Sequence, residues 1–267
     1  MAASSIARVF EHQALVYRRT LRGSLFSSFL NPVLYLAAMG VGLGMFVDRA
    51  AAAGAAGNPA LGGVTYLQYL APGLLAATVM QSAALESTHP IMGGIVYHRI
   101  YYAMIATPIS ARDIALGTLA WITARLTMIA VIFAVVVLAF GAAPSAGLLL
   151  AAIPVAVLTG MAFAAPIVAF AATQRNGEAF PAVFRFITTP LFLLSGTFFP
   201  LDGLPAPVQA AAWLSPLWHG IALARSIAFG AVGSNPGLAL DHLAVLLLFA
   251  GGGTWLAVRN LQRRLVK

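Results

Sequence analysis

Two long apolar runs decide the architecture: residues 114–140 read IALGTLAWITARLTMIAVIFAVVVLAF, and residues 148–172 read LLLAAIPVAVLTGMAFAAPIVAFAA. Arg125 is the only charged residue in either run. A helix that crosses a bilayer needs about 20 mostly apolar residues, and both runs exceed that length. The two stretches therefore predict a pair of membrane-spanning helices joined by a short connection.

The composition of the whole chain indicates an integral membrane protein. Of its 267 residues, 61% are apolar and 8% are charged, and the mean hydropathy is +0.91. Soluble domains average roughly 45–50% apolar and about 25% charged residues, so this chain has too little charge to cover a soluble surface. A soluble enzyme, a coiled coil and a disordered chain are excluded for the sequence as a whole. The absence of cysteine also excludes disulfides, cysteine-ligated metals and a thiol nucleophile.

Four more apolar runs bring the predicted number of spans to six: residues 29–47, 67–86, 186–199 and 243–258. The run at 186–199 is short for a crossing. The predicted fold class is all-α, a single polytopic membrane domain over residues 1–267 with six transmembrane helices.

The distribution of basic residues predicts that both termini lie in the cytoplasm. Only Arg49 and Arg225 fall on the opposite side of the predicted spans. Cytoplasmic loops of membrane proteins carry an excess of lysine and arginine. An even number of spans also requires the two termini to lie on the same side of the membrane. We attribute the net charge of +8 to orientation and to anionic membrane lipid, not to nucleic acid. The cytoplasmic set consists of Arg8, Arg18, Arg19, Arg22, Arg99, Arg112, Arg175, Arg185, Arg259, Arg263, Arg264 and Lys267.

Residues 3–22 predict an amphipathic helix in the cytoplasmic interface. Ile6, Val9, Phe10, Tyr17 and Leu21 recur at helical spacing, and charged residues occupy much of the rest. The alternative is a disordered basic leader.

The stretch between the last two spans predicts re-entrant helices. Residues 194–230 are too apolar for a solvated loop, yet four prolines (Pro200, Pro205, Pro207 and Pro216) cut them into pieces too short to cross. We expect residues 200–230 to dip into the outer leaflet and return, and the alternative is a folded external cap. The candidate residues of this region are Phe198, Phe199, Pro200, Trp213, Trp218 and His219.

No catalytic or metal-binding constellation is visible in the sequence. The seven acids are isolated from one another, and neither an H-E-x-x-H motif nor a phosphate-binding G-x-x-x-x-G-K-[ST] loop is present. The sequence therefore predicts a protein that is not an enzyme and that holds no cofactor or metal of its own.

Two ionisable residues fall within predicted spans, where charge is costly and suggests function. Glu86 lies near the inner end of the second span, and Arg125 lies within the third. Antiparallel neighbouring helices could bring them together as an ion pair. The alternatives to a functional role are a purely structural pair and an arginine that reaches an aqueous cavity.

Residues 98–110, HRIYYAMIATPIS, predict a short cytoplasmic helix that docks a soluble partner. Thr107-Pro108 stops that helix, and Ser110 is placed to cap the next one. Exposed aromatic and methionine side chains are unfavourable unless a partner covers them. The alternative is that these side chains pack against the cytoplasmic ends of the protein's own spans. The candidate docking residues are Tyr101, Tyr102, Met104, Ile105, Thr107 and Pro108.

Four motifs give the chain a resemblance to a known family, the permease subunits of type-2 ABC transporters. It looks most like the branch of nodulation-factor export, lipooligosaccharide export and daunorubicin-resistance permeases. The resemblance covers nearly the whole chain. Its motifs are YLAPGLLA (69–76), AMIATPIS with DIALG (103–110 and 113–117), LSGTFFPLDGLP (194–205) and LSPLWHGIALAR (214–225).

The resemblance implies an exporter in the bacterial inner membrane, built from two permeases, identical or paralogous, and two separate ATPase subunits that bind ATP and Mg²⁺. Residues 101–107 would be the coupling helix in the ATPase groove, and the N-terminal helix would help to grip the ATPase. Spans one, two and five would line the path at the dimer interface. Related sequences often carry glutamates where this chain has Tyr102 and Thr118, so a salt bridge from those positions to the ATPase is not expected here.

The leading hypothesis is thus a non-catalytic export subunit that moves an amphipathic drug, lipid or glycolipid outward, with a weak lean toward multidrug or lipid efflux. A proton-coupled secondary transporter with Glu86 as the carrier is the alternative, but clustered intramembrane acids and inverted repeats are not seen. A membrane-embedded transferase is disfavoured because it would need metal-binding carboxylates.

Overall fold

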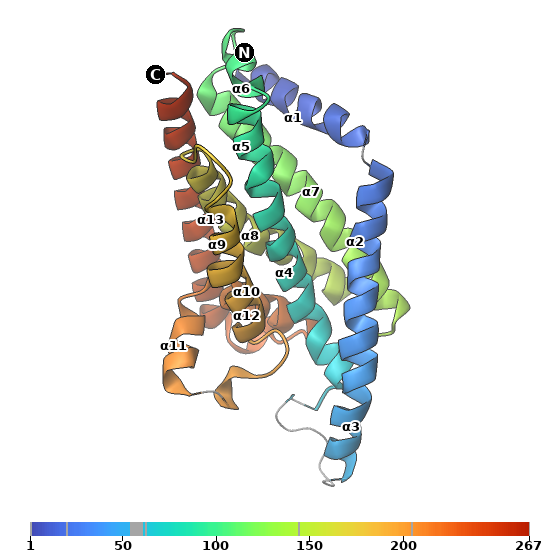
Figure 1. The fold of residues 1–267 in the computed structure, drawn as a ribbon. Coiled ribbons are helices and arrows are strands. Elements are labelled where there is room, and N and C mark those ends of the chain that lie inside the picture. The colour runs from blue at the N-terminus through green and yellow to red at the C-terminus, as the bar shows by residue number, and fades with distance from the viewer. Residues whose placement is uncertain are drawn as a thin grey trace.

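All regular structure in the described part of the chain is helical, as the all-α prediction requires (Figure 1). The computed structural model describes residues 2–19, 21–53, 61, 63–143, 145–203 and 205–266. The side chain of Arg22 and the whole of Lys267, two members of the predicted cytoplasmic set, lie outside the described residues, as does most of the predicted external loop.

Four helical segments of the described residues are long and apolar enough to cross a membrane. Two are α7 (Ala111–Ala139) and α8 (Ala146–Ala171), which correspond to the apolar runs at 114–140 and 148–172. The third is Pro32–Arg49, and the fourth is α13 (Pro236–Leu265), considerably longer than the predicted 243–258.

The other two predicted spans are helical but less apolar or shorter. Where 67–86 was predicted, α4 covers Tyr66–Ser87, and the polar residues Gln68, Gln81 and Glu86 reduce its apolar character. Residues Phe180–Leu194 form one shorter apolar helix, made of α9 (Phe180–Val183), η3 (Phe184–Thr188) and α10 (Thr189–Leu194). The six-span topology stays a prediction.

The N-terminal part consists of two helical arms. The first is α1 (Ala2–Arg18), where residues 3–22 were predicted. The second runs from Leu21 to Ala53 through α2 (Leu21–Tyr35), the π-helical η1 (Leu36–Leu43) and α3 (Gly44–Ala53), and so extends beyond the predicted 29–47 on both sides. Across the following loop, the Asp48 carboxylate accepts a hydrogen bond from the Tyr66 amide at 3.0 Å, which ties α3 to the start of α4.

Helix α8 is the centre of the bundle, packed against α4, α7, α13 and α12 (Pro216–Ala228). Small residues allow these close approaches, as is common between membrane helices. Gly160 of α8 lies where an added Cβ would be 2.7 Å from Leu126 of α7 and 2.8 Å from Val79 of α4. An added Cβ at Gly220 of α12 would likewise overlap Thr159 of α8, and one at Gly253 of α13 would overlap Pro166 of α8.

A break at Thr88 separates α4, the second predicted span, from the helix that follows it. Thr88 has φ −101° and ψ −97°, and α5 (His89–Val96) starts directly after it with Pro90 in its first turn. Arg99 then takes a left-handed conformation, with φ 51°, and reverses the chain into α6 (Ile100–Ile105). Figure 1 shows α5 and α6 at the same end of the molecule as both termini.

The predicted span at 186–199 is wrong in its bounds. Its helix begins earlier, at Phe180, and ends at Leu194, because Gly196 takes the left-handed conformation with φ 77° that ends helices. Phe198 and Phe199 therefore lie in an irregular segment. The chain continues through η4 (Leu201–Gly203), α11 (Ala206–Trp213), α12 and η5 (Val232–Ser234) into α13.

Candidate functional site

The segment from Arg99 to Ser110, which we name the docking turn, contains α6, connects α5 to α7 and holds the predicted docking residues. Tyr102, Thr107 and Pro108 are exposed, and Met104 and Ile105 are half-buried against the core. The Ser110 hydroxyl accepts a hydrogen bond from the Asp113 amide while the Asp113 carboxylate accepts from the Ser110 amide at 3.0 Å. This capping box confirms the predicted role of Ser110 and fixes where α7 begins.

Tyr101 is a correction to the predicted exposed surface. Its side chain is 2% exposed and fills the space left by Gly94 of α5, where an added Cβ would be 3.1 Å from the ring. Burial raises the pKa of the Tyr101 hydroxyl above its ordinary value, and the Thr118 and Gln13 side chains oppose that rise. Because Thr118 is itself 2% exposed, this position faces the interior and not a partner surface.

Tyr102 connects the docking turn to the C-terminal helix. Its hydroxyl donates a hydrogen bond to the Arg264 carbonyl of α13 at 3.3 Å. A pocket of about 520 Å³ lies beside this contact, lined by Ile95, Val96, Arg99, Tyr102 and Arg264. Both charged groups of this lining are arginines, so the pocket favours an acidic partner group.

Glu86 and Arg125, the two charges of the predicted spans, contact each other. Arg125 Nη2 donates to Glu86 Oε1 at 2.7 Å and Arg125 Nε donates to the same oxygen at 3.3 Å, with the side chains 8% and 25% exposed. The Arg125 guanidinium also lies 3.9 Å from the centre of the Tyr17 ring, a favourable cation–π geometry. The pair thus joins α4, α7 and the N-terminal helix α1.

Helix α1 lies against the first half of α7. The Trp121 ring of α7 contacts Phe10 and Tyr17 at centroid distances of 5.6 and 5.5 Å. Gly117 allows this approach, because an added Cβ would lie 2.6 Å from Val9 and 2.9 Å from the Ile6 carbonyl. The amphipathic N-terminal helix is therefore seated on the bundle next to the docking turn.

At the end of the bundle opposite the termini, α11 and α12 carry an aromatic cluster. Trp218 lies 6.1 Å from Trp213, 4.8 Å from His219 and 5.1 Å from His242 of α13, measured between ring centroids. His219 Nε2 lies 2.9 Å from the Trp213 carbonyl, which can only accept, so this nitrogen carries a proton. His219 Nδ1 then accepts from His242 Nδ1 at 2.8 Å.

This contact predicts a loss of stability at acidic pH. Burial lowers the pKa of His219 below its ordinary 6.5, so the unfolded chain binds more protons than the folded one as the pH falls through about 6.5. The contribution of His219 to the stability of the folded protein is complete above that pH and decreases as the pH falls below it. The reason is that a proton on His219 Nδ1 would face the Nδ1 proton of His242. We expect the thermal midpoint of the purified protein to fall from pH 7.5 to pH 5.5, and by less in His219→Gln. An equal fall in both proteins would contradict the assignment.

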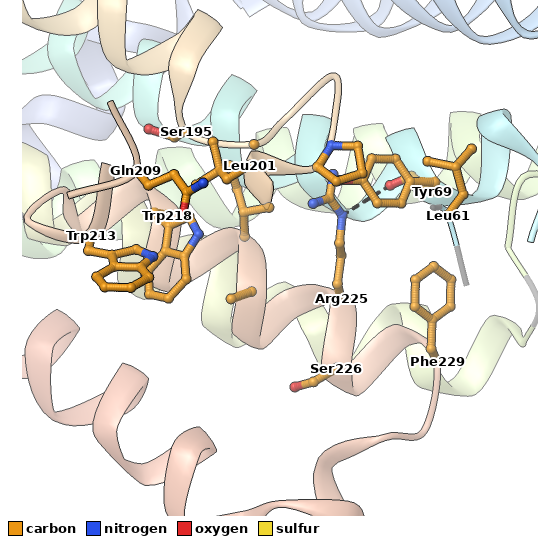
Figure 2. Close-up of a pocket in the computed structure, with 14 residues that line it drawn as sticks. Leu61, Tyr69, Ser195, Leu201, Gln209, Trp213, Trp218, Arg225, Ser226 and Phe229 are labelled. Atoms are coloured by element: carbon orange, nitrogen blue, oxygen red, sulfur yellow. Dashed lines mark hydrogen bonds between the residues drawn. The ribbon is translucent and has the colours of Figure 1, made fainter. Parts of the chain in front are cut away.

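A pocket of about 450 Å³ lies next to this cluster (Figure 2). Figure 2 shows the two tryptophans at one end of it and Arg225 with Tyr69 at the other. Arg225 Nε donates to the Tyr69 carbonyl at 3.2 Å, Nη2 donates to the Thr197 carbonyl at 2.9 Å, and the guanidinium lies 3.7 Å from the Tyr69 ring centre. Gly73 leaves room for this guanidinium, because an added Cβ would lie 2.7 Å from Nη2 and would displace the arginine side chain.

The structure thus brings some predicted residues together and separates others. Glu86 pairs with Arg125, and Pro200, Trp213 and Trp218 line one pocket, while Phe198 and Phe199 line a neighbouring one. Sequence reasoning missed Tyr17 and Arg225 as site residues. The available signal for Arg225 was a lone charge within the apolar run from Pro216 to Ala228. Within the described residues, no cluster of three or more histidine, aspartate or glutamate side chains is placed to bind a metal.

Three of the four motifs that carry the resemblance meet at Arg225. Tyr69 and Gly73 come from residues 69–76, Thr197 comes from residues 194–205, and Arg225 ends residues 214–225. The fourth motif forms the docking turn and the first turns of α7. The motifs therefore mark two places, one at each end of the bundle.

Comparison with known proteins agrees with this layout. The family model described as "ABC-2 type transporter" matches residues 6–229. Nodulation protein J of Rhizobium leguminosarum bv. trifolii is 31% identical over 260 residues, which cover 97% of this chain and 93% of the relative. Nodulation protein J of Rhizobium meliloti (strain 1021) is 29% identical over 258 residues, with the same coverage of both chains. The chain therefore belongs to the ABC-2 type transporter family of membrane proteins, as its motifs indicated.

Proposed function

We propose that this protein is the permease subunit of an ATP-binding cassette exporter in the bacterial inner membrane, which moves an amphipathic drug, lipid or glycolipid outward. A separate ATPase subunit would supply the energy, and α4 and the segment Phe180–Leu194 would complete six crossings. The proposal rests above all on the docking turn, which is exposed at its tip yet tied by buried or bonded side chains to α1, α7 and α13. A force on α6 would reach three other helices through those contacts.

Two further observations support the proposed permease and its orientation in the membrane. Arg99, Arg112, Arg175, Arg263 and Arg264 belong to loops or helix ends at the end of the bundle that holds both termini, as expected for a cytoplasmic face (Figure 1). Large apolar side chains such as Phe46, Phe186 and Ile187 are exposed on the segments Leu21–Ala53 and Phe180–Leu194. Lipid or a second permease copy would cover these faces, since apolar surface of this kind is unfavourable in water.

The alternative of a proton-coupled carrier at Glu86 finds less support. The Glu86 carboxylate accepts two hydrogen bonds from Arg125, the shorter at 2.7 Å, and so already serves as the counter-ion of a charge on the neighbouring helix α7. Uphill export by the purified chain alone, in liposomes without an ATPase, would nevertheless establish a secondary transporter and overturn the proposal.

A substitution on the exposed side of α6 tests the docking turn. Ala103 is exposed, so Ala103→Arg adds bulk and charge without disturbing the core. We expect ATPase subunits that co-purify with the full chain from native membranes to be depleted by about tenfold or more, with an unchanged thermal midpoint. The measurement is vanadate-sensitive ATP hydrolysis in the purified material.

Thr173→Arg is the matched control, because Thr173 is an exposed residue of the loop after α8 on the same side of the bundle. It should retain the ATPase. Full retention by Ala103→Arg, or the absence of any co-purifying ATPase with the unmodified chain, would contradict the proposal.

A further inference from the structure

The pocket around Arg225 has the chemistry of an anion-binding site. Arg225 is the only charged residue among the 14 that line it. Within the described residues, no carboxylate lies in ion-pair distance of its guanidinium, whose partners are the backbone carbonyls of Tyr69 and Thr197 and the side chain of Tyr69. A guanidinium has five N–H donors, so this one retains donors for a ligand. A positive charge in a half-buried pocket without a counter-ion attracts an anion.

A second polar group in the same lining is independent of Arg225. Ser195 is 0% exposed, lines the pocket, and its hydroxyl has no hydrogen-bond partner in the described structure. Leaving a buried hydroxyl without a hydrogen-bond partner is energetically unfavourable. An oxygen-rich ligand group would accept from this hydroxyl and remove that penalty.

The surroundings of the pocket suit an apolar chain attached to the anion. Leu61 and Pro200 also line a neighbouring pocket of about 610 Å³, whose lining consists of apolar side chains and Tyr66. That second lining includes Met39, Leu43, Phe198 and Phe199. The two pockets lie next to each other, because they share these two lining residues. A ligand that extends past Leu61 and Pro200 would place a charged group in the first pocket and a hydrocarbon chain in the second.

We propose that the pocket around Arg225 binds the anionic headgroup of the exported amphiphile, with its apolar part in the neighbouring pocket. The anionic oxygens accept from the donors that Arg225 retains, while Ser195, Trp213 and Trp218 contact the rest of the headgroup at the other end of the pocket (Figure 2). This inference rests on the proposed export function, because it names the chemical class of the cargo. The headgroup chemistry is a sulfate, phosphate or carboxylate.

Tryptophan quenching tests the binding directly. The full chain carries Trp255→Phe, since Trp255 is 60% exposed on α13 and would report on any lipid, and it is reconstituted in phosphatidylcholine nanodiscs. The probes are a brominated alkyl sulfate, the brominated alcohol of the same chain length, and inorganic sulfate. We expect saturable quenching by the alkyl sulfate at concentrations about tenfold or more below those needed for the alcohol. Trp213→Phe with Trp218→Phe should remove that quenching.

Variants of the two donors separate binding from folding. Arg225→Gln should raise the apparent Kd of the alkyl sulfate by about tenfold or more, and Ser195→Ala by about threefold, with little effect on the alcohol. Arg225→Lys keeps the charge and should restore the preference for sulfate over alcohol. Arg49→Gln removes an exposed charge from α3 at the same end of the molecule and should change nothing.

The outcomes distinguish this inference from the proposed function. Equal binding of sulfate and alcohol, or an unchanged affinity in both Arg225→Gln and Ser195→Ala, would overturn the anionic site. If the alkyl sulfate binds but fails to stimulate ATP hydrolysis by the complete transporter, the pocket holds a membrane lipid and the cargo assignment is wrong. If no ATPase partner exists, the export proposal fails while the binding result stands.

Discussion

Glu86→Gln is expected to destabilise the folded permease by about 3 kcal/mol, because it leaves a buried guanidinium without its counter-ion. Arg125 is 8% exposed, so little water reaches its guanidinium once the counter-ion is removed. Arg125→Gln should be milder, since the Glu86 side chain is 25% exposed and water can solvate its carboxylate. For a chain of this length, the larger effect corresponds to a fall of several degrees in the thermal midpoint. The measurement is thermal unfolding of the detergent-purified protein.

Double variants show whether the two residues act as a pair. Glu86→Gln with Arg125→Gln should be less destabilised than the sum of the single changes. The reversed pair, Glu86→Arg with Arg125→Glu, should recover only part of the loss, because it places a carboxylate against the Tyr17 ring where the guanidinium now lies 3.9 Å from the ring centre. Glu178→Gln, which removes an exposed acid, is the control. If both double variants are as unstable as the single changes combined, the ion pair is not what stabilises this junction.

The fold class and most helix positions could be predicted because hydropathy is a local property of the chain. The runs at 114–140 and 148–172 needed only a count of apolar residues, and the cap at Ser110 needed only the spacing to Asp113. Bounds were less accurate where a backbone conformation decides them. The left-handed conformation of Gly196 ends a helix that hydropathy alone extends to Phe199.

The sites were less predictable because they depend on which helices become neighbours. Tyr101 and Tyr102 are adjacent and chemically alike, yet one fills the space beside Gly94 and the other bonds to the C-terminal helix. Nothing local distinguishes them. The position of the Arg225 side chain similarly depends on hydrogen bonds to Tyr69 and Thr197, which are 156 and 28 residues away in the sequence. By contrast, the sequence could suggest the contact of Glu86 with Arg125, since these are the two ionisable residues of consecutive predicted spans and carry opposite charges.

Gly220→Ala is expected to displace α12 from α8 and to destabilise the fold by about 3 kcal/mol. The added Cβ would overlap the side chain of Thr159, which is 0% exposed and whose hydroxyl donates to the Val155 carbonyl at 2.8 Å. Overpacking a tightly packed interior commonly costs about 1–3 kcal/mol, and the upper end applies because a β-branched side chain in a helix has few other rotamers. Thermal unfolding measures the change, and displacement of α12 should also weaken alkyl sulfate binding at Arg225.

A size exchange separates steric overlap from a loss of glycine flexibility. Thr159→Gly opens the space that the new methyl group needs, so Gly220→Ala with Thr159→Gly should be more stable than the simple sum of its two single variants. Gly251→Ala is the matched control, because an added Cβ there meets nothing within 4 Å. Alanine favours a helix over glycine by about 1 kcal/mol, so this control should be stabilising. If Gly220→Ala behaves like Gly251→Ala, the close approach of α12 to α8 is absent from the folded protein, and with it the support that holds Arg225 against Tyr69.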